Sequence, residues 1–384
     1  MLSCKRGKFS LPVNETYLNC AYMSPIMHSV EKAGIRGIRR KRNPSQILPG
    51  EFFDEGQMLR KEFATLINAP TEDSIVIIPS VSYGIATVAK NINLQPGQNI
   101  IVAAEQFPSN FYAWSDVCAE RHANLKVVAP PKELTDRGKV WNERILEAID
   151  SNTRLVALGH VHWTDGTKFD LLRIRARTKD VNALLVIDGT QSVGALPFDV
   201  ATIRPDALIC AGYKWLLGPY SIGLAYFSDF FSDGKPLEEN WINRLQSEDF
   251  KNLVNYQSQY QPGALRYEVG EHSNFILVPM MLKALQQINR WHPNNIQDYC
   301  EAITKEALLE LQDHGYFVED QQFRSHHLFG IRVPHSANVE ELRNELLKRK
   351  IIVSYRGDAI RVSPNVYNRE SDMQKFVKVL TRKL

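Results

Sequence analysis

The segment Leu184-Leu-Val-Ile-Asp188-Gly-Thr-Gln191 is the strongest structural signal in the chain, together with Ala211-Gly-Tyr213-Lys214-Trp-Leu-Leu-Gly218-Pro219 downstream. The first is an apolar run that ends in an acid, and the second places one lysine among small and aromatic residues. Burial disfavours the charged form of lysine, so Lys214 is a candidate amine nucleophile with a lowered pKa. Asp188, at the end of a buried strand, is a candidate partner for a ring nitrogen. The same two segments also fit an ordinary α/β unit with a surface lysine and an acid that caps a helix.

A buried lysine and an acid of this kind indicate a pyridoxal 5'-phosphate (PLP) site, in which the lysine carries the cofactor and the acid faces the pyridinium. Such a site also needs a phosphate cradle. Pro79-Ser-Val-Ser82-Tyr83-Gly84 lies where a predicted strand turns into a helix, and free N–H groups at a helix start suit a phosphate. Helix capping alone would also favour Ser82 at this position.

Two further side chains complete the constellation. Phe107 follows another predicted strand end and is a candidate for stacking on the cofactor, with a place in the core as the alternative. Arg361 stands in the otherwise apolar segment 359–363, where an unpaired charge is costly. Because the planar fork of arginine matches a carboxylate, Arg361 is a candidate for binding a substrate carboxylate.

Composition excludes several other classes of protein. The chain has 384 residues, 44% of them hydrophobic and 23% charged, which fits two domains or one large domain with a cap. Its net charge of +3 argues against a dedicated nucleic-acid binder. The five cysteines are scattered, which suits reduced thiols in the cytoplasm and predicts no metal site. The sequence has no signal peptide and no apolar run of about 20 residues, so we expect a soluble cytoplasmic protein without membrane contact. It also has no GxGxxG or GxxxxGK[ST] motif, which disfavours NAD or ATP binding.

The hydrophobic pattern predicts an α/β core between about residues 70 and 235. Continuous apolar runs, typical of strands covered on both faces, predict strands at 75–79, 100–103, 125–129, 155–159, 184–188, 207–211 and 222–227. Helices are predicted between them at 83–91, 109–121, 142–149 and 171–181. A long amphipathic helix at 274–291 then leads into a C-terminal α+β domain.

The motifs DGTQSVG at 188–194, GYKWLLGP at 212–219 and IRVSPNVYN at 360–368, in this order, resemble the class V aminotransferase family of fold-type I PLP enzymes. The family includes cysteine desulfurases, kynureninase and isopenicillin N epimerase, and the resemblance runs from about residue 17 to residue 368. It implies a three-layer α/β fold with a mostly parallel seven-stranded sheet and a smaller C-terminal α+β domain. The large PLP-binding domain would be 36–269, and the small domain 1–35 with 270–384.

The resemblance also implies roles for the residues around the lysine. Lys214 would form the Schiff base with PLP and then act as the base that moves the Cα proton through carbanion chemistry. Asp188 would keep the pyridine nitrogen protonated, and Gln191 would hydrogen-bond the phenolic oxygen. Tyr213 matches a phosphate-binding tyrosine of kynureninases, and Arg361 matches the arginine that holds the substrate carboxylate.

Other positions match the cofactor-binding residues of the family less completely. Ser82 and the amides of Tyr83 and Gly84 correspond to the phosphate loop. Phe107 matches the stacking aromatic of the kynureninase-like FPxD motif, which is FPSN here, so that Asn110 replaces its acid.

The resemblance implies a homodimer with the active site at its interface. Residues 270–274 fall where many relatives have a Gly-Thr turn that reaches the partner subunit's phosphate, but Glu271 stands in place of the threonine. An acid beside a phosphate is unfavourable, so Glu271 is expected to point away and His272 or Ser273 to take over.

We therefore expect a PLP-dependent enzyme that acts on an amino acid by transamination, with a kynureninase-like, C–S lyase or epimerase reaction as alternatives. A PLP-binding regulator without turnover is the alternative of a different class. Cysteine desulfuration is disfavoured, because the segment 354–359 before Arg361 is short and lacks the cysteine that desulfurases carry there. The substrate side chain and the roles of Trp163, His160 and His162 stay open.

Overall fold

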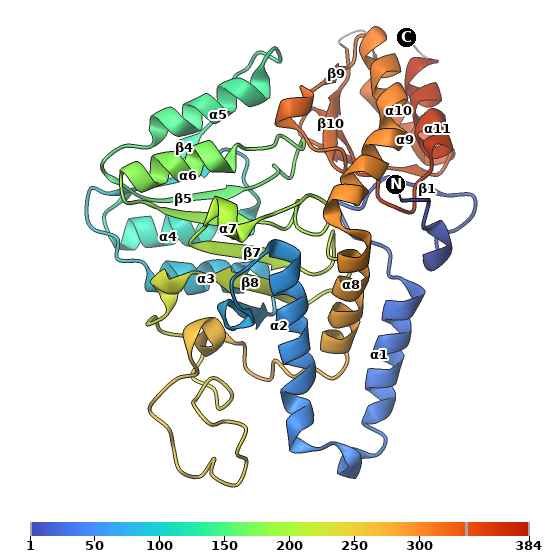
Figure 1. Cartoon of the computed structure of the whole chain (residues 1–384). Helices are drawn as coiled ribbons and strands as arrows, with labels where there is room; N and C mark the ends of the chain where they lie inside the picture. The colour runs from blue at the N-terminus through green and yellow to red at the C-terminus, as the bar shows by residue number, and fades with distance from the viewer. Residues whose placement is uncertain (1, 335–336, 383–384) are drawn as a thin grey trace.

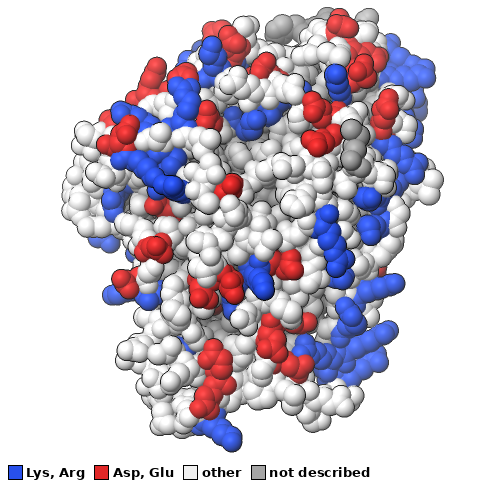
Figure 2. Space-filling model, viewed as in Figure 1, with Lys and Arg blue, Asp and Glu red and all other residues white. Residues whose placement is uncertain are grey.

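The computed structural model describes residues 2–334 and 337–382 of the chain. Figure 1 shows a large central sheet with helices on both faces and a smaller C-terminal unit beside it. None of the helices in the described ranges has the length and apolar character of a membrane span. Figure 2 shows positive and negative side chains interspersed over the same face, with Lys and Arg gathered near α1.

Seven strands form the central sheet in the order β2-β8-β7-β6-β5-β3-β4. β8 is antiparallel to both of its neighbours, and the other neighbouring pairs are parallel. The strands are β2 (Ile75–Ile78), β3 (Asn99–Ala103), β4 (Asn124–Val128), β5 (Thr153–Gly159), β6 (Leu184–Asp188), β7 (Ala207–Ala211) and β8 (Gly223–Phe227). The predicted seven-stranded, mostly parallel sheet is confirmed.

Both faces of the sheet are covered because alternate residues of each strand point to opposite sides. On one side, strand residues such as Val186 and Ile209 pack with α3 (Val81–Asn91) and α4 (Tyr112–Glu120). On the other side, Leu185 and Leu208 pack in one cluster with residues of several helices. These helices are α2 (Asp54–Ile67), α5 (Arg137–Ala148), α6 (Leu171–Asp180), α7 (Val200–Ile203) and α8 (Leu277–Trp291). The predicted three-layer architecture is thereby confirmed.

Several predicted helices begin a few residues away from the expected start, among them α3 at Val81 and α8 at Leu277. The helix expected from residue 109 starts at Tyr112, because Pro108–Asn110 forms a separate 3-10 helix, η5. The helix expected from residue 142 starts at Arg137, and its first two turns bury Trp141.

Helix α1 (His28–Arg40) packs along α8, beside α2 (Figure 1). A Cβ at Gly37 would lie 2.0 Å from the carbonyl oxygen of Phe275, so this approach requires glycine. The domain boundary predicted at residue 36 falls inside this continuous helix, and the division into domains stays a prediction.

The C-terminal unit is a four-stranded antiparallel sheet in the order β12-β13-β10-β9, packed with three helices. Its elements are α9 (Pro293–Asp313), β9 (Phe317–Val318), β10 (Phe329–Arg332), α10 (Val339–Lys348), β12 (Ser354–Arg356), β13 (Ala359–Val362) and α11 (Glu370–Thr381). The N-terminal strand β1 (Thr16–Tyr17) pairs in parallel with β11 (Ile351–Ile352). Leu18 is buried in the same core, so the start of the chain rests on its C-terminal part.

A buried ion network joins the two units. The Asp165 carboxylate, in the loop after β5, lies 2.7 Å from Arg137 of α5 and 3.0 Å from Arg332 of β10. The backbone N–H of Gly330 also donates to the carbonyl oxygen of Asp165, at 2.6 Å. Burial alone would raise the pKa of Asp165, but His162 and the two arginines outweigh burial and lower the pKa to about 2. The loop after β5 is therefore anchored to the C-terminal sheet by a carboxylate that is charged in the folded protein.

Replacing Asp165→Asn leaves two buried guanidinium groups without their shared anion, and we expect the free energy of unfolding to fall by about 3–5 kcal/mol. Because the folded-state pKa is depressed, the carboxylate stabilises the wild type above its unfolded pKa of about 3.9. This stabilisation is lost as the pH falls towards about 2. Urea unfolding at several pH values measures both effects.

The matched control is Asp358→Asn, which removes the exposed partner of Arg332 and is expected to cost about 1 kcal/mol or less. Equal stability losses for the two variants would contradict the anchoring role of Asp165.

Candidate active site

A cavity of about 340 Å³ lies where several parallel strands of the sheet end. Asp188 is the last residue of β6, and Lys214 lies in the loop after β7. In open α/β sheets, ligands bind at the carboxyl ends of the strands. The predicted site residues that line this cavity are Ser82, Phe107, Asp188, Gln191, Tyr213 and Lys214.

Lys214 is 6% exposed, and its side chain makes no hydrogen bond or ion pair with any residue in the described ranges. Its Nζ atom lies 5.4 Å from the ring centroids of Phe107 and of Tyr213. Burial lowers the pKa of Lys214 to about 8, with Asp188 opposing this shift and Arg361 adding to it. A large fraction of this amine is therefore neutral, and nucleophilic, near pH 8.

Asp188 is buried beside Lys214 and has no ion pair in the described structure. Burial raises the pKa of its carboxyl, while the N–H of Thr190, which donates to Asp188 Oδ1 at 2.9 Å, opposes the rise. A buried carboxylate without a cation is unfavourable, so this site suits a positively charged group of a ligand.

The side-chain amide of Gln191 has a fixed orientation. Its Oε1 accepts a hydrogen bond from the indole of Trp215 at 2.9 Å, and its Nε2 donates to the carbonyl of Ala21 at 3.1 Å. Since the oxygen is engaged, the group that Gln191 offers to the cavity is the second N–H of Nε2. Gln191 is thus oriented to donate to an anionic oxygen.

At the start of α3, Ser80 and not Ser82 is the helix cap. The Ser80 hydroxyl accepts from the N–H of Tyr83 at 3.2 Å and lies 3.1 Å from the Ser82 hydroxyl. The N–H of Gly84 donates to the carbonyl of Ser80, and a Cβ at Gly84 would lie 2.8 Å from Ile209 Cγ2. The N–H groups of Val81 and Ser82 are left free, as expected in a first helical turn. The free amides therefore lie earlier than the predicted ones, and a phosphate role for Tyr83 and Gly84 stays a prediction.

Aromatic side chains form one wall of the cavity. Phe107 and Trp163 meet edge to face with ring centroids 5.3 Å apart, and Tyr213 packs against Tyr220 at 4.6 Å. The buried Asn110 accepts a hydrogen bond from the indole of Trp114 at 2.9 Å. Asn110 is thus engaged within its own segment and does not line the cavity.

Arg361 is only 1% exposed and has no acidic partner among the described residues. One Nη donates to the carbonyl of Trp163 at 2.7 Å and the other to Ser354 Oγ at 3.4 Å, while Nε is unpaired. Burial, and then Arg356, lower the pKa of Arg361 to about 9. A buried guanidinium in this state favours an anion.

The sequence analysis missed Arg356 and left the role of Trp163 open. The Arg356 guanidinium lies 5.5 Å from the Trp163 ring and contributes to the lowered pKa of both Lys214 and Arg361. Arg356 stands in the short segment 354–359, and the signal that could have identified it is its closeness in sequence to Arg361. No sequence pattern around Trp163 indicates that its carbonyl accepts a hydrogen bond from Arg361, which lies far away in the sequence.

Three histidines lie outside this cavity. His272 is buried 3.4 Å from Glu268, and the exposed Glu271 precedes it in a left-handed conformation. His162 is bonded to Thr164 and to the carbonyl of Ala104. His160 faces a separate pocket. A role for His272 at a partner's phosphate stays a prediction.

The groups in and beside this cavity fit PLP. They include an amine with a lowered pKa, an uncompensated carboxylate, an oriented amide donor, free helix N–H groups and an unpaired buried arginine. Among the described residues, no group of three or more His, Cys, Asp or Glu is placed to hold a metal ion.

Comparison with known proteins agrees with this geometry. The family model "Aminotransferase class-V" matches residues 46–379, and the chain therefore belongs to the class V aminotransferase family. PLP is the cofactor of these enzymes and hence of this chain.

Three proteins illustrate the likeness. The uncharacterized aminotransferase YcbU of Bacillus subtilis is 26% identical over 87% of this chain and 85% of its own length. A probable cysteine desulfurase of Methanothermobacter thermautotrophicus is 32% identical over 54% of this chain and 51% of its own. A C-DES mutant with glycine covalently linked to its PLP cofactor superposes with a TM-score of 0.86 at 17% identity, covering 99% of this chain and 100% of C-DES. C-DES is described elsewhere as a cystine C–S lyase, and at this identity the likeness shows the fold alone. The predicted family, fold type and cofactor are confirmed.

In the protein without cofactor, Lys214 should react with an amine-acylating reagent with a half-maximal rate near pH 8. Exposed lysines of the same digest should follow the ordinary value of about 10.4. Arg361→Ala removes a nearby positive charge and should move the Lys214 midpoint upward. Mass spectrometry of the Lys214 peptide measures this, and a midpoint near 10 in the wild type would contradict the desolvated environment.

Proposed function

We propose that this protein acts on an α-amino acid by transamination, with PLP held by Lys214. Asp188 would face the ring nitrogen, Gln191 would donate to the phenolic oxygen and Phe107 would pack on the ring. The N–H groups of Val81 and Ser82 would bind the phosphate, with the Ser82 hydroxyl. Tyr213 is proposed as a further phosphate ligand.

The observation that carries the proposal is the buried Arg361, which lacks an acidic partner and lies close enough to Lys214 to lower its pKa. A substrate carboxylate would neutralise this guanidinium in a site of low dielectric constant, where charge-assisted hydrogen bonds are strong. An α-carboxylate bound there places the substrate amine beside the amine of Lys214. The pair Arg361 and Lys214 thus selects α-amino acids.

The chain's own residues supply binding and proton transfer. PLP, when bound, supplies an electron sink for the negative charge that develops at Cα. Lys214, with its pKa lowered to about 8, can release and take up a proton near neutral pH. The carboxylate of Asp188 would stabilise a positive charge on the ring nitrogen, and the same charge would lower the pKa of Asp188 from its raised value.

Cysteine desulfuration is less well supported than transamination, although desulfurases are among the relatives. Desulfuration needs a nucleophilic cysteine near the substrate, whereas Gly357–Asp358, between β12 and β13, carries none. Cys20 is buried near the site, but burial raises the pKa of its thiol to about 11. A C–S lyase reaction needs no protein thiol and is the second candidate, ahead of kynureninase-like or epimerase chemistry.

A regulator without turnover is disfavoured, because the side chains needed for chemistry are present and close together. The proposed homodimer is supported by exposed apolar side chains around α1 and α2, which include Ile35, Ile38, Leu48, Met58 and Ile276. The cytoplasmic location also stays a prediction.

Borohydride reduction of the holoenzyme should fix the cofactor covalently to Lys214, and mass spectrometry of the labelled peptide identifies the site. Incubation with a panel of amino acids should then yield keto acids. Release of sulfide would assign the lyase alternative, and release of alanine the kynureninase-like alternative. Racemisation of the added amino acid would assign the epimerase alternative. A label on another lysine would overturn the site assignment.

Arg361→Ala should keep the cofactor absorbance but bind the substrate about a hundredfold or more weakly, because the carboxylate loses its buried partner. Arg361→Lys keeps the charge without the planar fork, so substrate binding should recover only in part. Titration of the cofactor absorbance with substrate measures both affinities. Loss of the cofactor from Arg361→Ala would instead show that Arg361 holds PLP.

A further inference from the structure

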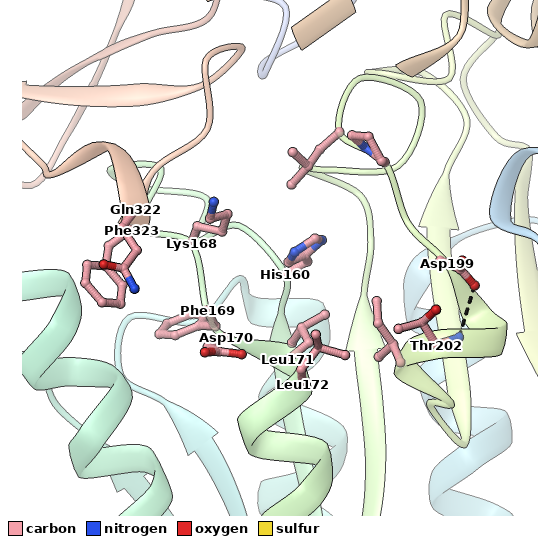
Figure 3. A pocket seen from close by; sticks show the side chains of 13 residues that line it. His160, Lys168, Phe169, Asp170, Leu171, Leu172, Asp199, Thr202, Gln322 and Phe323 are labelled. Carbon is pink, nitrogen blue, oxygen red and sulfur yellow. Dashed lines mark hydrogen bonds between the residues drawn. The ribbon is translucent and has the colours of Figure 1, made fainter. Parts of the chain in front are cut away.

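A second cavity, of about 500 Å³, is lined by both ends of the loop 160–169, whose middle carries Trp163. It shares no lining residue with the PLP cavity. Its walls come from the loop after β5, the first turn of α6, the segment 196–203 and the 3-10 helix η8 (Gln321–Phe323). Figure 3 shows His160 between Lys168 on one side and Thr202 on the other.

His160 is a buried polar group of this cavity with unused hydrogen-bonding capacity. It is 9% exposed, and its ring makes an edge contact with Phe198. Its Nδ1 is covered by surrounding atoms and has no partner, so Nε2, which bonds to no described residue, is the ring nitrogen that a ligand can reach. Burial lowers its pKa to about 3, so the imidazole is neutral near pH 7. Buried polar groups are nearly always satisfied, and an unpaired one in a cavity wall points to a ligand or water.

Lys168 gives the cavity a positive group. It is half-buried, and its Nζ makes no hydrogen bond or ion pair with any residue in the described parts of the chain. Burial lowers the pKa of Lys168, and the nearby Arg324 lowers it further. Two carboxylates also line the cavity, but each already caps a helix: Asp170 accepts from the N–H of Arg173, and Asp199 from that of Thr202. Asp170 favours the charged form of Lys168 but makes no ion pair with it, so the Lys168 ammonium is the positive group that this cavity offers to an anion.

The rest of the cavity surface is mainly apolar. The side chains concerned are Phe169, Leu171, Leu172, Leu196, Ile203 and Phe323. Leu172 is more than half exposed and forms the rim. Apolar walls with a few polar groups are typical of small-molecule sites.

We propose that this cavity binds a small carboxylate with an apolar side chain, of the class formed by branched or aromatic amino acids and their keto acids. The carboxylate pairs with Lys168, and the imidazole of His160 forms a hydrogen bond with the ligand. The apolar side chain packs against Phe169 and Leu196.

The position of the cavity makes it an effector site, because two loops serve both cavities. The loop 160–169 is closed by an antiparallel bridge between Val161 and Lys168, and its tip carries Trp163, whose carbonyl holds Arg361. The backbone N–H of His160 donates to the carbonyl of Asp188 at 3.3 Å. The segment that follows Asp188 reaches the second cavity at Leu196. A ligand that favours one arrangement of these loops changes the affinity of the PLP site for its substrate, and the substrate changes the ligand's affinity by the same factor.

Equilibrium dialysis of the holoenzyme with phenylalanine and, separately, with phenylpyruvate tests the proposal. Lys168→Met should weaken binding at the second site roughly ten- to a hundredfold, as expected for loss of a charge-assisted hydrogen bond. Arg361→Ala should leave this site intact while it weakens binding at the PLP site about a hundredfold or more. Lys179→Met, an exposed lysine of α6 outside the cavity, is the matched control. Binding of phenylalanine alone, of phenylpyruvate alone or of both supports the proposal and shows whether the site takes the amino acid, the keto acid or both.

Leu172→Trp narrows the rim from an exposed position and should also weaken binding, with Leu309→Trp on α9 as its control. Absence of any binding that depends on Lys168 or Leu172, up to millimolar probe, would overturn the proposal. Failure of the proposed transamination is distinguishable, because it would appear as no reaction with any amino acid while binding that depends on Lys168 persists.

Discussion

Three ionisable side chains are buried together without matched ion pairs, and the fold is built around this constraint. Burial lowers the pKa of Lys214 and of Arg361 and raises that of Asp188. Each shift means that the charged form is disfavoured in the folded protein, so the site reduces stability until a ligand supplies the missing charges. The sheet tolerates this because both of its faces are covered by large apolar clusters.

The parallel sheet brings Asp188 and Lys214 together by register. Asp188 pairs with Ile209 on the neighbouring strand, and the N–H of Gly189 donates to the carbonyl of Ile209. Lys214 follows in a tight loop that is closed by a hydrogen bond from the N–H of Gly218 to the carbonyl of Gly212. A Cβ at Gly218 would lie 2.2 Å from Met281 Sδ, so a larger residue there would force the buried Met281 side chain to move. The lysine is thus held on a short, rigid loop at the end of a buried strand.

The part of the site that comes from parallel strands was predictable from the sequence, and the part that depends on distant contacts was not. Asp188, Gln191 and Lys214 stand at the ends of apolar runs, so local pattern and motif sufficed to predict them. The anchor between Asp165 and Arg332 joins residues far apart in the sequence, and no local pattern marks such a pair. The residue that caps α3 was also not predictable from the sequence. Ser80 and Ser82 are both serines, and only the φ and ψ angles at the start of α3 make Ser80 the cap.

Arg361, the proposed substrate-binding arginine, is already oriented in the protein without a ligand. A guanidinium has five N–H groups, and Arg361 uses one for the carbonyl of Trp163 and one for Ser354. The remaining N–H groups are enough for a bidentate carboxylate, in a plane that these two bonds already define. Asp165 fixes the loop that carries Trp163, so its bond to Arg332 acts on Arg361 through the backbone. If Arg361 binds the substrate carboxylate as proposed, this preorganisation sets where the carboxylate lies, and with it the direction of the bonds at Cα. On that proposal, the choice between transamination and elimination depends on the loop 160–169 as much as on the lysine.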